Sequence, residues 1–306
     1  MVTQLPSPAG KKQLTLAFIG CGNMGSSILS GLLSATRTQE GKITHFIVST
    51  KTSASAERLR KEYAADLFRV DIAHDANLLA IRQADIVLLA CKPFLAKGIL
   101  SAHGIADAMA GKLVISIMAG MTPGDILGCL GDGDGDTEDR EGKKVRIVRA
   151  MPNVAARLGK SMTVVEVPEA DGDGNGGIGE EEVEVVEWVF GVIGKVKFLT
   201  PELFDVGTML VGASIGVMTV PVEGVLDGCV VEGLRRGEAL EMMAQTLEGM
   251  AALLREGVHP AVLRESISSP RGCTIQGVMT VERAGVRAKF ADAMIDGTRH
   301  LRGAKR

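Results

Sequence analysis

The feature that most constrains the fold of this chain is a glycine-rich turn between an apolar run and a helical pattern. The run Leu14–Ile19 is typical of a buried strand, and the sequence GCGNMG follows it at positions 20–25. In such a GxGxxG turn the first glycine permits a tight turn, the second lets a pyrophosphate approach the backbone, and the third lets helix and strand pack closely. Free N–H groups of the helix beginning here would face the phosphates. The turn predicts a dinucleotide-binding site, with a purely structural glycine turn as the alternative.

Short apolar runs alternate with helical patterns up to about residue 200. The runs that predict further strands are His45–Ser49, Asp85–Ala90, Leu113–Ile117, Val145–Val148, Thr163–Val167 and Val196–Phe198. This alternation is typical of βαβ units and a parallel sheet covered on both faces. After Pro201 the apolar residues recur at helical spacing instead. We expect a flexible N-terminus (1–13), an α/β Rossmann domain (14–199), and an all-helical domain (200–306) whose apolar stripes bury against a second copy.

Composition and charge bear on partners and compartment. The net charge is −3 and aromatic residues make up only 3% of the chain, so we expect no binding to nucleic acid or to an anionic membrane. No window of about 18 apolar residues is free of charge, so no transmembrane helix is expected. Five widely spaced cysteines without a CxxC pair argue for a reducing compartment and against a zinc ribbon. We expect a cytoplasmic protein without a metal site, with a transit peptide as the alternative.

Two stretches rich in glycine and aspartate interrupt the pattern, at Gly131–Gly142 and Asp171–Glu182. Both are typical of solvated surface loops. The second also matches the calcium loop of EF-hands, but a strand pattern and Pro168 stand where the entering helix would be. A solvated loop is therefore the preferred interpretation, and a calcium site the alternative.

The residues after the second expected strand bear on the choice between NAD and NADP. An NAD-binding protein usually carries an acid here, whereas this chain has Ser49, Thr50 and Lys51, followed by two more hydroxyl residues. A carboxylate would repel a 2′-phosphate, while hydroxyls and a lysine can bind it. We predict NADPH as the cofactor, with NADH possible but weaker. The alternative is a solvated polar loop without a ligand.

A second candidate anion site precedes the helical pattern Ile275–Arg283. The sequence SSPRGCT at 268–274 offers short hydroxyls and, at the start of a helix, free backbone N–H groups. A substrate carboxylate would satisfy these donors. An ordinary helix cap is the alternative.

Six stretches together resemble the pyrroline-5-carboxylate reductase family. They are FIGCGNMG, LLACKPFLAKGIL, ISIMAGMT, RAMPNV, HPAVLRESISSPRGCTI and GVMTVERAGVRAKFADAM, and the resemblance as a whole extends from about Leu14 to Leu301. The resemblance implies a Rossmann domain followed by a helical dimerisation domain that interlocks with a partner subunit, with a cleft at the dimer interface. It also implies that NADPH reduces the cyclic imine 1-pyrroline-5-carboxylate to L-proline, the last step of proline biosynthesis.

The resemblance also implies roles for individual residues. The residues implied at the cofactor are Gly20, Gly22, Asn23, Met24 and Gly25 in the pyrophosphate turn, Ser49 and Thr50 at the ribose phosphate, Asn77 at the adenosine end, Lys92 and Pro93 beside the cofactor, and Ala119 and Gly120 near the nicotinamide. Lys51, next to Thr50, and Cys91, next to Lys92, are further candidates for contact with the cofactor. The residues implied at the substrate are Asn153 in the MPN turn and Ser269, Gly272, Cys273 and Thr274 in the carboxylate loop. Arg271 lies in the same loop and is a further candidate for binding the carboxylate, although it does not match the family. The Thr274 hydroxyl would point toward the ring nitrogen as the catalytic group.

The chain departs from the family pattern in three places, all on the substrate side. Residues 211–217 stand where the family has SGSGPAY, Val154-Ala155 replaces the TP of MPNTP, and Arg271 replaces a glycine of SSPGG. Arg271 either pairs with the carboxylate or points to water. The departures leave two alternatives open, a reductase of another cyclic imino acid and a catalytically impaired dinucleotide-binding regulator. A β-hydroxyacid dehydrogenase shares the opening fold but needs a catalytic lysine at the start of its helical domain. This alternative is disfavoured because Gly207–Val222 contains no lysine.

Overall fold

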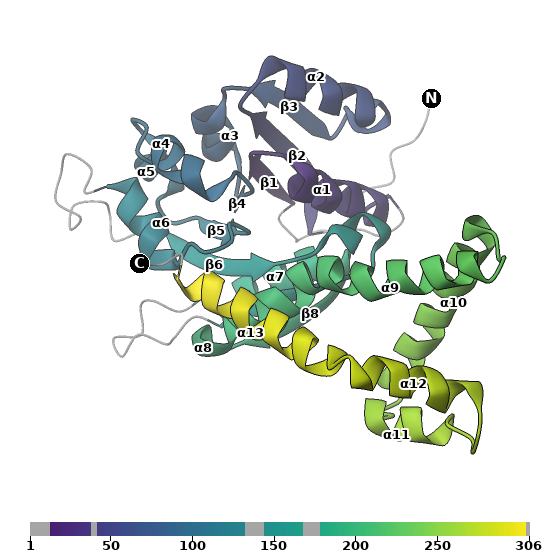
Figure 1. Cartoon of the computed structure of the whole chain (residues 1–306). Helices are drawn as coiled ribbons and strands as arrows, with labels where there is room; N and C mark the ends of the chain where they lie inside the picture. The colour runs from purple at the N-terminus through teal and green to yellow at the C-terminus, as the bar shows by residue number, and fades with distance from the viewer. Residues whose placement is uncertain (1–12, 38–41, 132–143, 168–177, 304–306) are drawn as a thin grey trace. The chain divides into compact units, whose positions relative to one another are not determined.

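The computed structural model describes residues 13–37, 42–131, 144–167 and 178–303. The chain forms two compact units (Figure 1). Unit 1 comprises Met1–Gly212 together with His300–Arg306, and unit 2 comprises Ala213–Arg299.

Unit 1 contains an eight-stranded sheet with the order β3-β2-β1-β4-β5-β6-β7-β8. The strands are β1 Leu14–Ile19, β2 Ile43–Thr50, β3 Val70–His74, β4 Ile86–Leu89, β5 Leu113–Ser116, β6 Arg146–Met151, β7 Ser161–Glu166 and β8 Gly194–Leu199. Neighbouring strands from β3 across to β6 are parallel, as the sequence predicts. In contrast to that prediction, β7 is antiparallel to β6, with Met151 opposite Val164. The edge strand β3 was not expected from the sequence.

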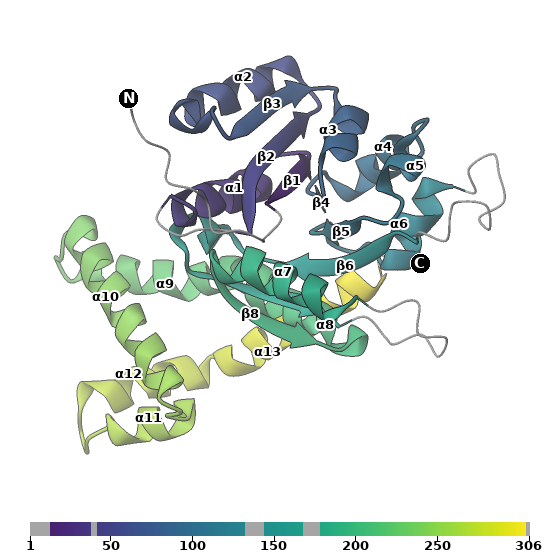
Figure 2. The same cartoon turned by 180° about the vertical axis from the view of Figure 1, so that it is seen from behind.

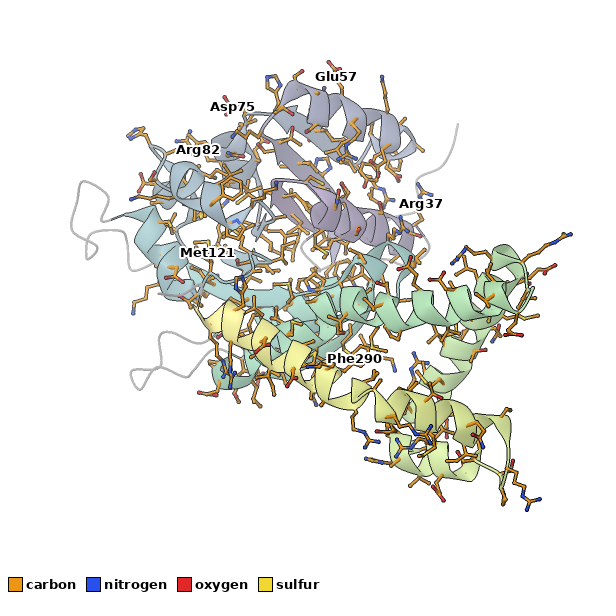
Figure 3. The ribbon with its side chains drawn as sticks, viewed as in Figure 1. Arg37, Glu57, Asp75, Arg82, Met121 and Phe290 are labelled. Carbon is orange, nitrogen blue, oxygen red and sulfur yellow. The ribbon has the colours of Figure 1, made fainter. Side chains whose placement is uncertain are left out.

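Helices cover both faces of this sheet (Figures 1 and 2). The helices of unit 1 are α1 Asn23–Ala35, α2 Ser53–Glu62, α3 Asn77–Gln83, α4 Ala96–Leu100, α5 Ile105–Met109, α6 Pro123–Leu130, α7 Glu180–Gly191 and α8 Pro201–Thr208. Alternate residues of each strand lie on opposite faces of the sheet, because successive side chains of a strand point to opposite sides. Leu16 and Phe18 pack with the apolar residues of α1, α2 and α7, whereas Ala17 and Ile19 pack with those of α3 to α6. Figure 3 shows side chains filling the space between the sheet and its helices.

Unit 2 is helical and buries few of its own side chains. Its helices are α9 Ser214–Val231, α10 Arg236–Arg255, α11 Pro260–Ser266, α12 Cys273–Arg283 and α13 Val286–Gly303, the last of which ends in unit 1. Within 213–303, all of which the structure describes, only Leu226, Ala239 and Thr298 are buried. The twenty residues of α10 bury Ala239 alone. Such helices lack a core of their own in a single chain.

One helical run in the described part of the chain is long and apolar enough to cross a membrane. It is Pro201–Val231, which joins α8 and α9 through a π-helical turn at Met209–Ala213. The criterion is one of length and composition only, and helices of soluble proteins also meet it. The run also contains Pro221, inside α9, and acidic residues such as Glu223 and Asp227. No transmembrane helix was expected from the sequence, because no window of about 18 apolar residues is free of charge, whereas this run combines high hydropathy with a few acidic residues.

Candidate dinucleotide and anion sites

The predicted cofactor residues follow strands whose carboxyl ends meet at one edge of the sheet. Strands β1, β2, β4, β5 and β6 are parallel, so the residues that follow them share this edge. The chain order reverses between β1 and β4. Ligands of open α/β sheets bind outside the carboxyl ends of the strands at such a switch point. The glycine turn at 20–25 directly follows β1 and therefore lies there.

The geometry of this turn requires glycine at position 20. Gly20 has φ +87°, and a Cβ there would lie 2.9 Å from both the Cα and the N of Cys91, two residues after β4. Its N–H donates to the Ser49 carbonyl oxygen at 2.9 Å, which ties the turn to β2. A Cβ at Gly22, by contrast, would meet no atom within 4 Å. The backbone at Gly22 is thus open to a ligand.

The helix that follows the turn begins without a side-chain cap. Gly22 is the N-cap of α1, no side chain bonds to this end, and the first turn carries no acidic residue. Asn23 is exposed and Met24 is half-buried, while Gly25 is buried against the turn. A thirteen-residue helix with an uncapped, acid-free N-terminus favours an anion.

The two hydroxyl residues at the end of β2 are buried and already have partners. Ser49 Oγ donates to Asn77 Oδ1 at 2.7 Å and accepts from the Ala76 N–H at 3.2 Å. Thr50 Oγ1 donates to the Thr52 and Ala73 carbonyl oxygens at 3.0 and 3.3 Å. The structure therefore brings Ser49 and Asn77 into direct contact. It leaves Lys51 as the exposed cation of this segment.

The residues after β4 and β5 form the other side of the switch point. Cys91 Sγ lies 3.5 Å from the Met118 sulfur, and burial raises the pKa of the Cys91 thiol to about 11. Lys92 and Pro93 are exposed, with Lys92 Nζ 5.8 Å from the centre of the Phe94 ring. Ala119 and Gly120 follow β5, and Gly120 has φ +77°. Burial likewise raises the pKa of the Cys21 thiol to about 11, so both thiols stay protonated at neutral pH.

Arg58 is a cation at this site that sequence reasoning missed. Its Nη2 lies 3.5 Å from the Cys21 carbonyl oxygen in the glycine turn, and its Nη1 pairs with Glu62 Oε2 at 2.6 Å. In the sequence, Arg58 and Glu62 form an i,i+4 pair that is typical of a solvated helix face. Only the packing of α2 beside the turn brings this guanidinium to the predicted phosphate site.

Asn153 lies at the same edge, at the end of β6, and is buried. Its Oδ1 accepts from the Ala155 N–H and its Nδ2 donates to the Val211 carbonyl oxygen, both at 3.0 Å. Its own N–H donates to Ser161 Oγ at 3.0 Å. Sequence reasoning placed this residue at the substrate, and the structure gives its side chain two partners within the protein.

The predicted carboxylate loop lies in unit 2 and leads into α12. Gly272 is the N-cap of α12, no side chain caps this helix, and a Cβ at Gly272 would lie 2.5 Å from Ser269 Oγ. Arg271 has φ +60°, a left-handed conformation that glycine adopts at lower cost. Cys273 is exposed and Thr274 is half-buried, and these two residues are the first of the helix. The eleven-residue helix thus presents free N–H groups beside the Thr274 hydroxyl.

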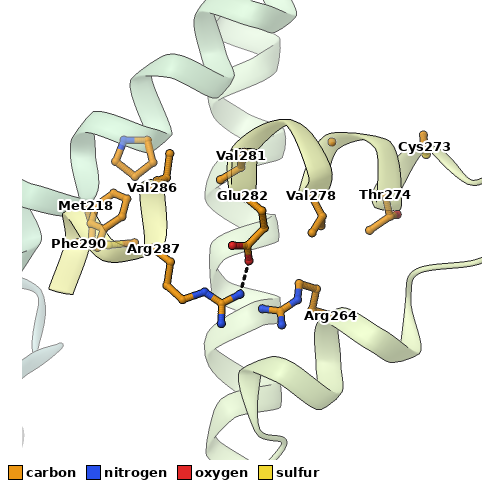
Figure 4. A pocket seen from close by; sticks show the side chains of 12 residues that line it. Met218, Arg264, Cys273, Thr274, Val278, Val281, Glu282, Val286, Arg287 and Phe290 are labelled. Atoms are coloured by element: carbon orange, nitrogen blue, oxygen red, sulfur yellow. Dashed lines mark hydrogen bonds and ion pairs between the residues drawn. The ribbon is translucent and has the colours of Figure 1, made fainter. Parts of the chain in front are cut away.

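A cavity of about 750 Å³ adjoins this loop within unit 2. Thr274, Val278 and Phe290 contribute to its lining, together with Arg264 and the Glu282–Arg287 ion pair (Figure 4). The two arginines and one glutamate leave one excess positive charge at an otherwise apolar wall. The structure thus brings the predicted loop residue Thr274 to a cavity with a cationic side.

The sequence predicts no metal site, with a calcium site at Asp171–Glu182 as the alternative. In the ranges that the structure describes, no group of three or more His, Cys, Asp or Glu side chains lies together as a metal site would require. The calcium alternative at Asp171–Glu182 falls mostly outside the described residues, which resume at 178.

The fold and the glycine turn define a dinucleotide-binding Rossmann protein with an appended helical unit. Two family models match: "NADP oxidoreductase coenzyme F420-dependent" over residues 15–120 and "Pyrroline-5-carboxylate reductase dimerisation" over residues 201–303. A pyrroline-5-carboxylate reductase of Lophium arboricola is 37% identical, covering 94% of this chain and 92% of that protein, and one of Neurospora crassa is 35% identical, covering 96% and 93%. The chain belongs to the pyrroline-5-carboxylate reductase family.

A solved structure agrees with this assignment at the level of the fold. The pyrroline carboxylate reductase of Plasmodium falciparum, solved with NADP bound, matches with a TM-score of 0.78 at 20% identity, covering 97% of this chain and all of that one. The enzyme of Streptococcus pyogenes matches with a TM-score of 0.75 at 23% identity, covering 96% and 98%.

Proposed function

We propose that this chain is an NADPH-dependent reductase that converts 1-pyrroline-5-carboxylate to L-proline, the last step of proline biosynthesis. The observation that carries the proposal is 37% identity to a named pyrroline-5-carboxylate reductase over 94% of the chain. The glycine turn at the switch point supports it, because that turn suits a dinucleotide. The test is oxidation of NADPH on addition of 1-pyrroline-5-carboxylate, with L-proline quantified as the product. Binding of NADPH without turnover would favour a dinucleotide-binding regulator instead.

Catalysis in this proposal consists mostly of positioning. NADPH supplies the hydride, and the residues of this chain hold the two reactants. The N-terminus of α1 and the open backbone at Gly22 bind the pyrophosphate. The N–H groups that begin α12 bind the substrate carboxylate, and the Thr274 hydroxyl oxygen accepts a hydrogen bond from the N–H of the protonated ring nitrogen. An imine is easily protonated, so the reaction does not demand a strong acid from the protein.

Lys51 carries the preference for NADPH over NADH in this proposal, because the hydroxyls of Ser49 and Thr50 are engaged inside the protein. We expect Lys51→Glu to weaken NADPH binding about tenfold or more while changing NADH binding little, since a hydrogen bond to a charged group contributes about 1.5–3 kcal/mol. Titration of cofactor fluorescence measures both dissociation constants. The matched control is Lys61→Glu, which makes the same change of charge at the far end of α2. Equal loss of both cofactors, or no loss, would contradict the assignment.

The exposed apolar residues of unit 2 pack against a second copy of the chain in this proposal. Val220 is 69% exposed on α9, and α10 buries one residue of twenty. We expect a mass of at least twice 32.2 kDa by light scattering at micromolar concentration. Val220→Asp should raise the dissociation constant of the dimer, because it places a charge in an apolar interface. Phe68→Asp is the control, since Phe68 is 81% exposed in unit 1. A stable monomer of the unmodified chain would refute the proposal.

A reductase of another cyclic imino acid is the second candidate. Arg271 favours it, because the chain holds a bulky cation at φ +60° in the predicted carboxylate loop, where glycine is the residue of low cost. Comparison of kcat/KM for 1-pyrroline-5-carboxylate with that for six-membered cyclic imino acids separates the two candidates. We further propose a cytoplasmic location. All five cysteines are free, which suits a reducing compartment.

A further inference from the structure

The helical run Pro201–Val231 is interrupted by the π-helical turn Met209–Ala213. A π-helical turn shifts the hydrogen-bond pattern by one residue. Such turns are rare in proteins, and those that occur are often found at functional sites. This one includes the last residues of the first segment of unit 1, Met1–Gly212. It also includes the start of residues 211–217, where the sequence departs from the family pattern. What holds the turn in this form therefore bears on the reaction.

The side chain of Asn153 bonds directly to this turn. Asn153 Nδ2 donates to the Val211 carbonyl oxygen at 3.0 Å, across 58 residues of sequence. Asn153 is 7% exposed, so water does not readily replace this bond. The opposite end of the same amide, Oδ1, accepts from the Ala155 N–H. One side chain thus joins the residues that follow β6 to the π-helical turn.

Apolar packing places the turn against the same strands. The Val211 side chain is buried with Val164 of β7 and Phe204 of α8. Met151, two residues before Asn153, packs against this cluster, and its Cγ would lie 3.9 Å from a Cβ at Gly212. The Asn153 bond is therefore the polar part of a contact that also has an apolar part.

We propose that Asn153 is a positioning residue that keeps Met209–Ala213 in the π-helical form through the Val211 carbonyl. In this role Asn153 acts on the chain that enters α9 and does not bind the substrate carboxylate. The effect on kinetics rests on the proposed imine reduction, whereas the hold on the turn exists without any ligand.

The first test is Asn153→Asp, measured by amide hydrogen exchange in the full chain without cofactor or substrate. The substitution keeps the volume and the acceptor for Ala155, and it removes the donor to Val211. We expect exchange across residues 209–217 to become about tenfold faster, the order expected for loss of one hydrogen bond. Exchange across β1 should not change. A residue that only bound substrate would leave exchange in the free protein unaltered.

Kinetics give the second readout. We expect kcat for the imine to fall about tenfold, with the dissociation constant of NADPH within about twofold of the unmodified chain. Asn153→Ser removes the same donor without adding a charge, so it decides the outcome if Asn153→Asp does not fold. The matched control is Ser161→Ala, which removes the acceptor of the Asn153 N–H and leaves the amide side chain in place.

Unchanged exchange at 209–217 in Asn153→Ser would overturn the proposal. A rise in KM for the imino acid alone would also overturn it and would assign Asn153 to the substrate. If the unmodified chain does not reduce 1-pyrroline-5-carboxylate, the proposed function fails, while the exchange result still decides whether Asn153 holds the turn.

Discussion

Replacement of Arg149 by methionine should lower the free energy of unfolding by about 3–5 kcal/mol, the usual loss when one partner of a buried ion pair is removed. Arg149 is 4% exposed in β6. Its Nη1 lies 3.2 and 3.1 Å from the two carboxylate oxygens of Glu166, and its Nη2 lies 3.3 Å from Asp205 Oδ1. The guanidinium carbon also lies 4.2 Å from the centre of the Phe204 ring. Without Arg149, two buried carboxylates lose the cation between them.

Denaturant unfolding of the two proteins measures the loss. The control is Arg146→Met, in the same strand, because Arg146 pairs with Glu182 nearer the surface. Exposed ion pairs contribute about 0–1 kcal/mol, so Arg146→Met should change stability far less. Equal effects of the two substitutions would show that the buried network contributes no more than a surface pair. The network joins β6, β7 and α8, and these elements also surround the Asn153 contact.

Thr274→Val should lower kcat/KM for 1-pyrroline-5-carboxylate about tenfold or more. Valine keeps the shape of threonine and removes the hydroxyl, and a hydrogen bond to a charged partner contributes about 1.5–3 kcal/mol. Thr274 lies in the first turn of α12, next to the cap Gly272 and against the cavity of unit 2. NADPH affinity should change little, because the glycine turn lies in unit 1.

The control for this prediction is Thr280→Val in the same helix. Thr280 is exposed, and its hydroxyl donates to the Gln276 carbonyl oxygen at 3.1 Å. Steady-state kinetics with saturating NADPH should show little change in Thr280→Val. Full activity of Thr274→Val would leave the sequence SSPRGCT as a helix cap only, and an equal loss of NADPH affinity would show a general defect.

Some of the fold could be predicted because it depends on local pattern. The strand, glycine turn and helix at 14–35 follow from an apolar run, three spaced glycines and a helical stripe. The edge strand β3 was missed because its five residues VDIAH carry only a short alternation, with one face exposed. The sequence did contain a signal that β7 runs antiparallel to β6. Only residues 152–160 separate it from β6, and a parallel crossover needs a dozen or more.

Some residues of the candidate site could likewise be predicted from the sequence, and others could not. Its glycines could be identified because their spacing has a direct steric cause, which the 2.9 Å approach of Cys91 to Gly20 makes explicit. The burial of Ser49 and Thr50 could not be predicted, because exposed and buried hydroxyls look alike in a sequence. The same holds for Arg58, whose distance to the Cys21 carbonyl depends on where α2 packs.

The sequence by itself determined most of the strands and several of the helices of this protein, where the phosphate turn lies, and which family the chain resembles. These properties depend on residues close together in the chain, so a local pattern is enough to reveal them. Only the tertiary structure decided that Arg149 neutralises two buried carboxylates and that the Asn153 amide meets the carbonyl of Val211. A hydrogen bond depends on tenths of an ångström between atoms, and the packing of whole elements sets such distances between residues 58 positions apart.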